Sequence, residues 1–211
     1  MTALELARGP LTEGELDDWY AVPDDADPGA RWVRGSFIAT LDGRVTGPDG
    51  LSGGLNEGSA GDHAAFGTQR RWAQAVVVGA GTARSEGYGP LEGCLLVVVT
   101  RSGKVPESLR DHPDVLVVGG DGDEVTPARV LEAVGERGLH RVVVDGGPAL
   151  FGAWVAAGAV DELCLTVRPV IAGGEGPSLL PADVRLPELL GRATHLLEWE
   201  GDLLLRLRLG A

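Results

Sequence analysis

The chain has 211 residues and a formal net charge of −13 at pH 7, and 44% of its residues are hydrophobic. This composition predicts a folded protein, and a chain of this length buries one complete hydrophobic core. The acidic charge disfavours nonspecific binding to nucleic acid or to an anionic membrane, although a pocket for a small anion depends on local charge alone. The two cysteines, Cys94 and Cys164, exclude a disulfide framework and a four-thiolate metal site. We find no apolar run long enough to cross a membrane and no apolar signal core near the N-terminus, which predicts a cytoplasmic location.

The first 31 residues are acidic and rich in turn signals. Apolar residues within 11–20 predict one short amphipathic helix with Thr12 as its N-cap, and the proline-bounded run at 23–28 predicts the end of that helix. We interpret residues 1–31 as an N-terminal arm and residues 32–211 as a single domain.

Four short apolar runs are typical of strands covered on both faces, because they are β-branched, do not alternate, and end at glycine or polar residues. They are residues 75–79, 95–100, 115–119 and 141–145. Helix signals separate some of these runs. They are the capping-box pattern at 59–62, the cap and first turn at Thr126 and Pro127, and the proline-led segment 148–157. Alternating strands and helices predict an α/β fold with a mainly parallel sheet.

The C-terminal part of the chain has a different pattern. Residues 163–171 predict a long strand, and Pro169 within it favours an edge or bent strand. Residues 195–200 and 203–209 flank a turn at 201–202 and predict an antiparallel hairpin with one solvated face. The predicted sheet is therefore mixed.

Two glycine-rich turns follow predicted strands. The turn at residues 79–82 lets backbone N–H groups approach a ligand, but it matches neither a dinucleotide-binding fingerprint nor a P-loop, and a plain strand–helix turn has equal weight. In the second turn, Asp145 precedes Gly146, Gly147 and Pro148, so that a helix start with exposed N–H groups follows a carboxylate. The alternative role for Asp145 is a helix cap. If both strands are parallel, both turns lie at the carboxyl edge of the sheet, where open α/β sheets bind ligands.

Six motifs occur in an order and at a spacing that match a known family. They are Thr40-Leu41-Asp42-Gly43-Arg44, Ser52-Gly53-Gly54, Gly79-Ala80-Gly81-Thr82, Asp145-Gly146-Gly147-Pro148-Ala149-Leu150, Val160-Asp161-Glu162-Leu163 and Pro169-Val170-Ile171-Ala172-Gly173-Gly174. With these motifs, the chain resembles the pyrimidine reductase of riboflavin biosynthesis, which is the C-terminal domain of the bifunctional deaminase-reductase, over roughly residues 32–211. The resemblance implies a dihydrofolate-reductase-like fold: a mixed, mainly parallel sheet flanked by helices, with a C-terminal antiparallel hairpin. It also implies a homodimer, NADPH as hydride donor, and reduction of the ribosyl side chain of a phosphorylated aminopyrimidine to a ribityl chain.

The resemblance assigns three groups of residues by position. The catalytic residues would be Asp145, which stands where the family usually has a substrate-binding Glu, and Arg44. The cofactor-binding residues would be Ala39, Thr40, Gly79, Ala80, Gly81, Thr82, Glu86, Gly146, Gly147, Pro148, Ala149, Leu150 and Phe151. The substrate-binding residues would be Asp42, Ser52, Asn56 and Arg70.

The chain departs from the family pattern at residues 85–91, where the family usually has Asp-Asp-Pro-x-Leu-Thr-x-Arg. The missing Arg commonly helps to hold the substrate phosphate, and Arg70, Arg71 or Arg84 are the candidates to replace it. We therefore expect a local cluster of arginines and backbone donors around a phosphorylated ligand. The zinc ligands of the fused deaminase, His-x-Glu and Pro-Cys-x-x-Cys, do not occur, so we predict neither deaminase activity nor a metal. Two alternatives stay open: a reductase of the same fold for a pterin or another imine or carbonyl substrate, and a non-catalytic nucleotide-binding paralogue.

Overall fold

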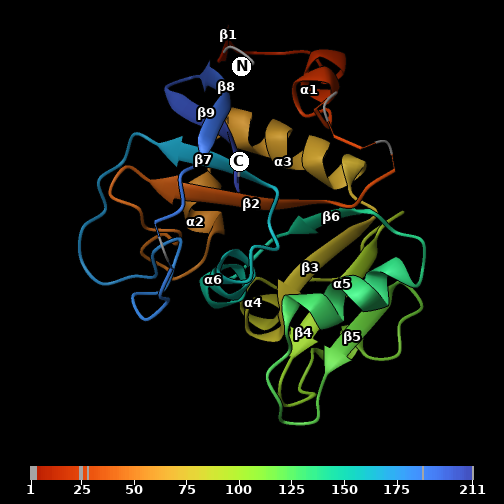
Figure 1. Ribbon diagram of the computed structural model, residues 1–211. Helices are drawn as coiled ribbons and strands as arrows, with labels where there is room; N and C mark the ends of the chain where they lie inside the picture. The colour runs from red at the N-terminus through yellow and green to blue at the C-terminus, as the bar shows by residue number, and fades with distance from the viewer. Residues whose placement is uncertain (1–3, 24–25, 28, 187, 211) are drawn as a thin grey trace.

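One mixed sheet organises the chain (Figure 1). The computed structural model describes residues 4–23, 26–27, 29–186 and 188–210, and in these residues the sheet has nine strands. Their order across the sheet is β1 (Glu5–Arg8), β8 (Arg192–Trp199), β9 (Asp202–Arg208), β7 (Glu162–Arg168), β2 (Trp32–Thr40), β6 (Arg141–Val144), β3 (Ala75–Gly79), β4 (Leu95–Thr100) and β5 (Val115–Gly119). Strand β9 runs antiparallel to both of its neighbours, and every other neighbouring pair is parallel. The predicted fold class, a mainly parallel sheet with a C-terminal antiparallel hairpin, is confirmed.

Helices cover both faces of this sheet because successive strand residues point to opposite sides. On one face, Val77 lies in the core that includes α5 (Pro127–Gly135) and α6 (Pro148–Ala156). On the other face, Val76 and Val78 pack against α4 (Ala80–Ser85) and the C-terminal end of α3 (Ala60–Trp72). Farther along this second face, α1 (Glu13–Trp19) and α3 together cover β7, β8 and β9.

Local capping chemistry starts three of the helices where the sequence predicts them. Thr12 accepts a hydrogen bond from the N–H of Glu15, whose side chain bonds back to Thr12, so α1 has a complete capping box. Ser59 accepts from the N–H of Asp62 at the start of α3, and Thr126 caps α5. None of the helices in the described residues is both long and apolar enough to cross a membrane.

The strand predicted over residues 163–171 is confirmed as far as Arg168, but its expected position at an edge of the sheet is wrong. Strand β7 lies inside the sheet between β2 and β9, and it ends at Arg168. Pro169 follows the last paired residue, so its missing N–H removes no bond from the sheet. The structure also contains elements that we did not predict: β1, β2, α2 (Gly53–Asn56), α4 and the short 3-10 helix Glu107–Leu109. The expected helix end at residues 23–28 lies partly outside the described residues.

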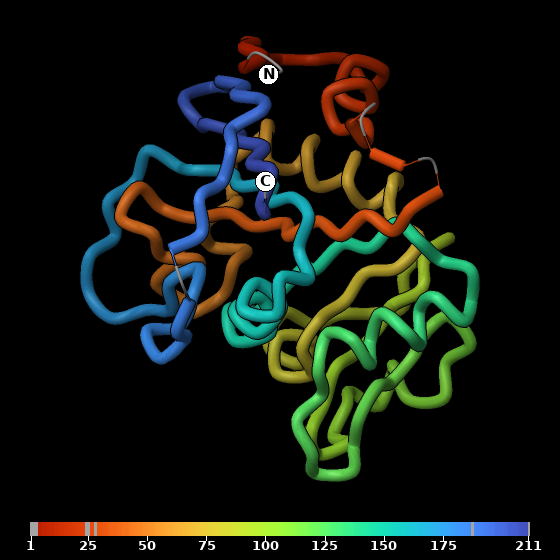
Figure 2. The backbone as a smooth tube through the Cα atoms, viewed as in Figure 1, coloured from red at the N-terminus to blue at the C-terminus, as the bar shows by residue number. Residues whose placement is uncertain are grey.

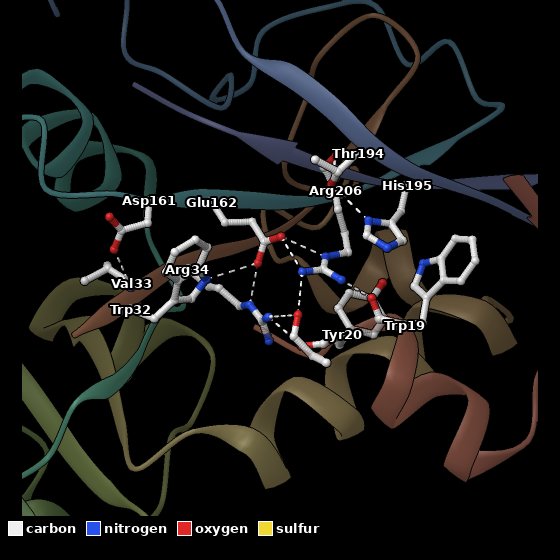
Figure 3. Close-up of polar contacts among 11 residues, drawn as sticks. Trp19, Tyr20, Trp32, Val33, Arg34, Asp161, Glu162, Thr194, His195 and Arg206 are labelled. Atoms are coloured by element: carbon white, nitrogen blue, oxygen red, sulfur yellow. Dashed lines mark hydrogen bonds and ion pairs between the residues drawn. The ribbon is translucent and has the colours of Figure 1, made fainter. Parts of the chain in front are cut away.

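A buried charge cluster fixes the N-terminal residues to the sheet (Figure 3). The carboxylate of Glu162 accepts hydrogen bonds from Nε of Arg34 at 2.6 Å and from Nε of Arg206 at 2.8 Å. The same guanidinium groups donate to backbone carbonyls at the end of α1: Arg34 to Tyr20 at 2.5 Å, and Arg206 to Trp19. Burial would raise the pKa of Glu162, but the two guanidinium groups outweigh it and hold that pKa below its ordinary value.

Residues near the two ends of the chain lie side by side, because β1 pairs in parallel with β8 (Figure 2). The segment predicted as an arm, residues 1–31, therefore contributes β1 and α1 to the same sheet and helix layer as the rest of the chain.

Candidate active site

A cavity of about 530 Å³ opens where β2, β6, α3 and α4 meet. Its wall also includes part of the 45–56 loop and Pro177. The volume lies within the range of about 300–1,000 Å³ that is usual for small-molecule sites. The turns that leave β3 and β6 reach this place together, as expected for parallel neighbours.

The two glycine turns are in direct contact, which confirms that they share one edge of the sheet. The N–H of Gly79 donates to the carbonyl of Gly146 at 2.9 Å. Gly146 has φ +109°, a conformation that favours glycine, and a Cβ on Gly147 would lie only 2.7 Å from Thr82 Oγ1. Gly79 and Gly147 are the N-cap residues of α4 and α6, and neither supplies a side-chain cap. The N–H groups of the first turn of each helix, which in α6 begin at Ala149 because Pro148 has none, therefore lack a side-chain cap and can donate to a ligand.

Asp145 lies at the end of β6 and is held by two donors on the same oxygen. Arg70 donates to Oδ2 at 2.5 Å, and the hydroxyl of Tyr88 donates to Oδ2 at 2.6 Å. The side chain of Asp145 is 7% exposed. Burial raises its pKa, and the positive charge of Arg70 and the Tyr88 hydrogen bond oppose that rise. The guanidinium of Arg70 also lies 4.6 Å from the ring centroid of Phe66, which fixes its position further.

Tyr88 was not among the predicted site residues. Burial and the nearby Asp145 carboxylate raise its pKa, so its hydroxyl stays protonated and acts as a donor. Tyr88 lies within residues 85–91, where the sequence departs from the family pattern. This departure was the sequence feature that could have identified Tyr88 as a site residue.

Asp62 is a second acid of the cavity wall that sequence reasoning missed. The pattern at 59–62 identifies it as a capping residue, and its N–H does bond to Ser59. Its side chain, however, lines the cavity, and the residue is only 9% exposed. Burial raises its pKa, while the Thr166 hydroxyl opposes this rise. The signal that could have found it is the four-residue spacing of 62, 66 and 70 on α3, which puts these side chains on one helix face.

Many of the residues assigned by resemblance lie together in the cavity wall. They are Ser52, Asn56, Arg70, Thr82, Glu86, Asp145, Gly146, Gly147 and Pro148. Glu86 also joins two parts of the wall, because its Oε1 accepts a hydrogen bond from the Ser52 N–H at 2.9 Å. Their binding roles remain proposals.

Other assigned residues lie outside this wall. They are Ala39, Thr40, Asp42, Arg44, Gly79, Ala80, Gly81, Ala149, Leu150 and Phe151. The Arg44 guanidinium donates to the carbonyls of Gly174 and Gly176. Asp42 accepts from the Thr40 hydroxyl at 2.6 Å and from two N–H groups of the 172–173 loop, and these bonds lower its pKa to about 2. The Phe151 ring is buried in the core, 4.5 Å from the ring centroid of Phe37.

The described wall is acidic, and the expected arginine cluster does not form there. It contains three carboxyl groups, those of Asp62, Glu86 and Asp145, and the guanidinium of Arg70. The other candidate arginines are engaged elsewhere: Arg71 pairs with Glu13 and Asp17, and Arg84 donates to the Lys104 carbonyl. In the described part of the chain, no group of three or more His, Cys, Asp or Glu side chains is placed to hold a metal ion.

Comparisons with known proteins agree with the fold. The family described as "RibD C-terminal domain" matches residues 31–202. The chain is 27% identical over 215 residues to "Riboflavin biosynthesis protein RibD" of Mycobacterium tuberculosis, covering 94% of this chain and 58% of that protein. It is 36% identical over 62 residues to the protein of the same name from Bacillus amyloliquefaciens, covering 29% of this chain and 17% of that protein. The chain thus spans little more than half of the M. tuberculosis relative.

Two solved structures show the same fold. A pyrimidine reductase-like protein from Corynebacterium diphtheriae superposes with a TM-score of 0.73 at 22% identity, covering 86% of this chain and 92% of that one. RibD of Acinetobacter baumannii superposes with a TM-score of 0.71 at 22% identity, covering 87% of this chain and 59% of that one.

Proposed function

Because the chain belongs to the RibD C-terminal domain family, we propose that it is a pyrimidine reductase of riboflavin biosynthesis. In this proposal it reduces the ribosyl side chain of an aminopyrimidine ribose phosphate to a ribityl chain, with NADPH as hydride donor. The observation that carries the proposal is the position of Asp145. Its carboxyl group lies in the cavity wall next to both glycine turns, and Arg70 and Tyr88 bind one of its oxygens.

The two helix starts fit the phosphate-bearing part of a nicotinamide nucleotide. Gly79 and Gly147 leave the N–H groups of α4 and α6 without side-chain caps, and a Cβ on Gly81 would meet no other atom within 4 Å. Backbone N–H groups at helix starts bind phosphate, and the missing side chains permit a close approach. When bound, the nicotinamide supplies the hydride.

Asp145 then has an electrostatic and orienting role. Arg70 and Tyr88 occupy Oδ2, and the structure records no hydrogen bond to Oδ1 from the described residues. Oδ1 is thus the oxygen that accepts a sugar hydroxyl or faces the positive charge of an iminium carbon. A fixed carboxylate in a buried site stabilises such a charge more strongly than water does.

In this proposal Arg44 does not contact the substrate and acts through a loop that it holds in place. Its guanidinium binds the carbonyls of Gly174 and Gly176, and the N–H of Val45 donates to the Pro177 carbonyl at 3.0 Å. Pro177 lines the cavity, so Arg44 positions the loop that closes this side of the site. Because an arginine stays protonated near neutral pH, it is a poor proton donor.

The test is oxidation of NADPH by the purified chain in the presence of the ribosylaminopyrimidine phosphate. We expect substrate-dependent oxidation, and Asp145→Asn should lower kcat/KM by about 10²-fold, the size expected for loss of one electrostatic group. Glu13→Gln, which changes an exposed carboxylate on α1, is the matched control and should leave turnover unchanged.

Two results would contradict the proposal. NADPH binding without oxidation of any ribosylaminopyrimidine would indicate a nucleotide-binding paralogue. Oxidation with dihydrofolate but not with the pyrimidine would indicate a pterin reductase of the same fold. The homodimer and the cytoplasmic location also belong to the proposal, and light scattering on the purified chain tests the homodimer.

A further inference from the structure

The side chain of Arg168, the last residue of β7, lies on the face of the sheet that α1 and α3 cover. Alternate residues of a strand point to the same face, so Arg168 shares this face with Cys164 and Thr166. Cys164 belongs to the core beneath α1 and α3, and the Thr166 hydroxyl lies beside Asp62 of α3. Arg168 therefore leaves the sheet near the start of α3, where α2 precedes it in the chain.

The guanidinium of Arg168 binds the carbonyl end of α2. Its Nη1 donates to the carbonyl of Leu55 at 2.5 Å and to the carbonyl of Glu57 at 3.0 Å. The last carbonyls of a helix have no partner within that helix and carry partial negative charge, so a guanidinium is favourable there. Because α2 has only four residues, it is too short to be stable in water by itself. Arg168 supplies part of the tertiary support that this single turn needs.

A buried carboxylate holds the guanidinium of Arg168 in place. Nε of Arg168 lies 3.0 Å from Oδ1 of Asp202, the first residue of β9, in an ion pair. The other carboxylate oxygen of Asp202 accepts a hydrogen bond from the hydroxyl of Ser59, the N-cap residue of α3. The side chain of Asp202 is only 6% exposed, so the loss of either partner is costly and Arg168 keeps one orientation. These contacts join the ends of two strands to the start of α3.

Asn56 is the cavity-wall residue that these contacts fix. It stands between the two carbonyls that Arg168 binds, and its own carbonyl accepts a hydrogen bond from the Ser59 N–H at 2.9 Å. Three successive carbonyls, those of residues 55–57, are therefore bound. The structure records no hydrogen bond to the side-chain amide of Asn56 from the described residues. An amide group has two N–H donors and an acceptor oxygen, so a fixed backbone presents an unoccupied polar group to the cavity.

We propose that Arg168 is a positioning residue of the reductase site, which holds α2 so that the amide of Asn56 faces the substrate. Arg168 is not part of the described cavity wall, so it acts through Asn56 and does not touch the substrate. It directly precedes the motif that begins at Pro169, and the resemblance assigns it no role. The inference rests on the proposed function, because that function supplies the substrate that Asn56 meets.

Kinetics of the full chain with the ribosylaminopyrimidine phosphate test the inference. Arg168→Ala should raise KM for this substrate at least tenfold, whereas the Kd for NADPH, which we assign to the turns before α4 and α6, should change less than twofold. Arg168→Lys keeps a positive charge and N–H donors but lacks the planar fork, so its KM should lie between those of wild type and Arg168→Ala. A merely structural role would weaken the binding of both ligands together.

A double-mutant cycle shows whether Arg168 acts through Asn56. In an Asn56→Ala background the amide is gone, so Arg168→Ala should raise KM by no more than a further twofold. Equal factors in both backgrounds would overturn the inference, as would a KM within twofold of wild type in folded Arg168→Ala. Arg137→Ala is the matched control, since Nη1 of Arg137 also donates to a backbone carbonyl, that of Ala133 at 2.7 Å, but at an exposed position beyond α5. Its KM should equal that of wild type.

Hydrogen exchange followed by mass spectrometry measures the hold of Arg168 on α2 without substrate. The N–H groups of residues 55–57 and 59 are bonded within this segment, and their exchange should become at least tenfold faster in Arg168→Lys, while residues 80–85 of α4 keep the wild-type rate. Unchanged exchange at 55–59 would overturn the inference even if Arg168→Ala does not fold. Absence of turnover in the wild-type chain would instead be a failure of the proposed function, so the two failures are distinguishable.

Discussion

Replacement of Glu162 by Gln removes the central charge of the buried cluster that joins the N-terminal residues to the sheet (Figure 3). Glu162 lies between Arg34 and Arg206, and none of the three residues is more than 1% exposed. The substitution keeps the shape of the side chain and one acceptor oxygen. Both guanidinium groups, however, remain buried without a neutralising partner, while they still bind the carbonyls at the end of α1.

The expected loss of stability is large. Breaking a buried ion pair by removing one partner costs about 3–5 kcal/mol, against a total of about 5–15 kcal/mol for a typical domain. For a chain of this length each kcal/mol lowers Tm by about 2–4 °C, so Glu162→Gln should lower Tm by about 6–20 °C. Equilibrium unfolding in urea, followed by circular dichroism, measures the free energy directly.

The loss should also depend on pH. Because the folded pKa of Glu162 lies below its ordinary value of 4.5, its contribution is fully present above that value and is lost as the pH falls through the folded pKa. The difference in stability between wild type and Glu162→Gln should therefore be greatest near neutral pH and shrink below about pH 4.5.

Glu13→Gln is the matched control, since Glu13 pairs with Arg71 at 3.1 Å but is 71% exposed. Such a surface pair contributes about 0–1 kcal/mol. If Glu162→Gln loses no more stability than Glu13→Gln, the buried cluster does not hold residues 19–21 in place, and the reasoning from burial is refuted.

Three further predictions concern the site. Tyr88→Phe removes one of the two donors to Asp145 and should lower kcat/KM about tenfold. The pH–rate profile should show the pKa of Asp145 raised further, because a hydrogen bond to its carboxylate is lost. An unchanged profile would contradict a positioning role for Tyr88. Gly147→Ala places a Cβ 2.7 Å from Thr82 Oγ1. The affinity for NADPH, measured by fluorescence titration, should therefore fall at least tenfold, with a smaller effect on Tm. An unaltered affinity would show that this turn is not part of the cofactor site. Asp42→Asn should destabilise the chain near neutral pH. The difference in stability from wild type should vanish between about pH 4 and pH 2, because the folded pKa of Asp42 is about 2 and its ordinary value is 3.8. A difference in stability that persists below that range would exclude the Asp42 carboxylate as its cause.

The parts of the fold that the sequence predicts correctly are those decided by local chemistry. Thr12, Ser59 and Thr126 each satisfy N–H groups within three residues of themselves, so their helices are readable without knowledge of the sheet. The meeting of the two glycine turns follows from parallel strands alone. Strand β7 was placed wrongly because the partner that covers it, β9, comes from a hairpin some forty residues later in the chain.

The candidate site was only partly predictable for the same reason. The hydrogen bond between Tyr88 and Asp145 joins residues 57 positions apart, and no local pattern encodes it. Asp62 satisfies a capping pattern, so its local role concealed the direction of its side chain. Arg44 follows the family motif in sequence, yet the carbonyls of Gly174 and Gly176 engage its guanidinium, and only the folded chain brings these groups together.

The acidic cavity wall constrains how a phosphorylated ligand can lie. Its one described guanidinium, that of Arg70, is already neutralised by Asp145, so the side chains of this wall offer no unpaired positive charge to a phosphate. The uncapped N–H groups of α4 and α6 carry partial positive charge and are the hydrogen-bond donors that this edge offers to a phosphate. Phosphate groups are therefore expected at the glycine turns, and the N–H-bearing part of the ligand at the three carboxyl groups of the wall. Under the proposed function, this polarity lets a chain with a net charge of −13 bind a phosphorylated ligand: the donors of the ligand would face the acidic side, and its phosphate groups would face the backbone dipoles on the other.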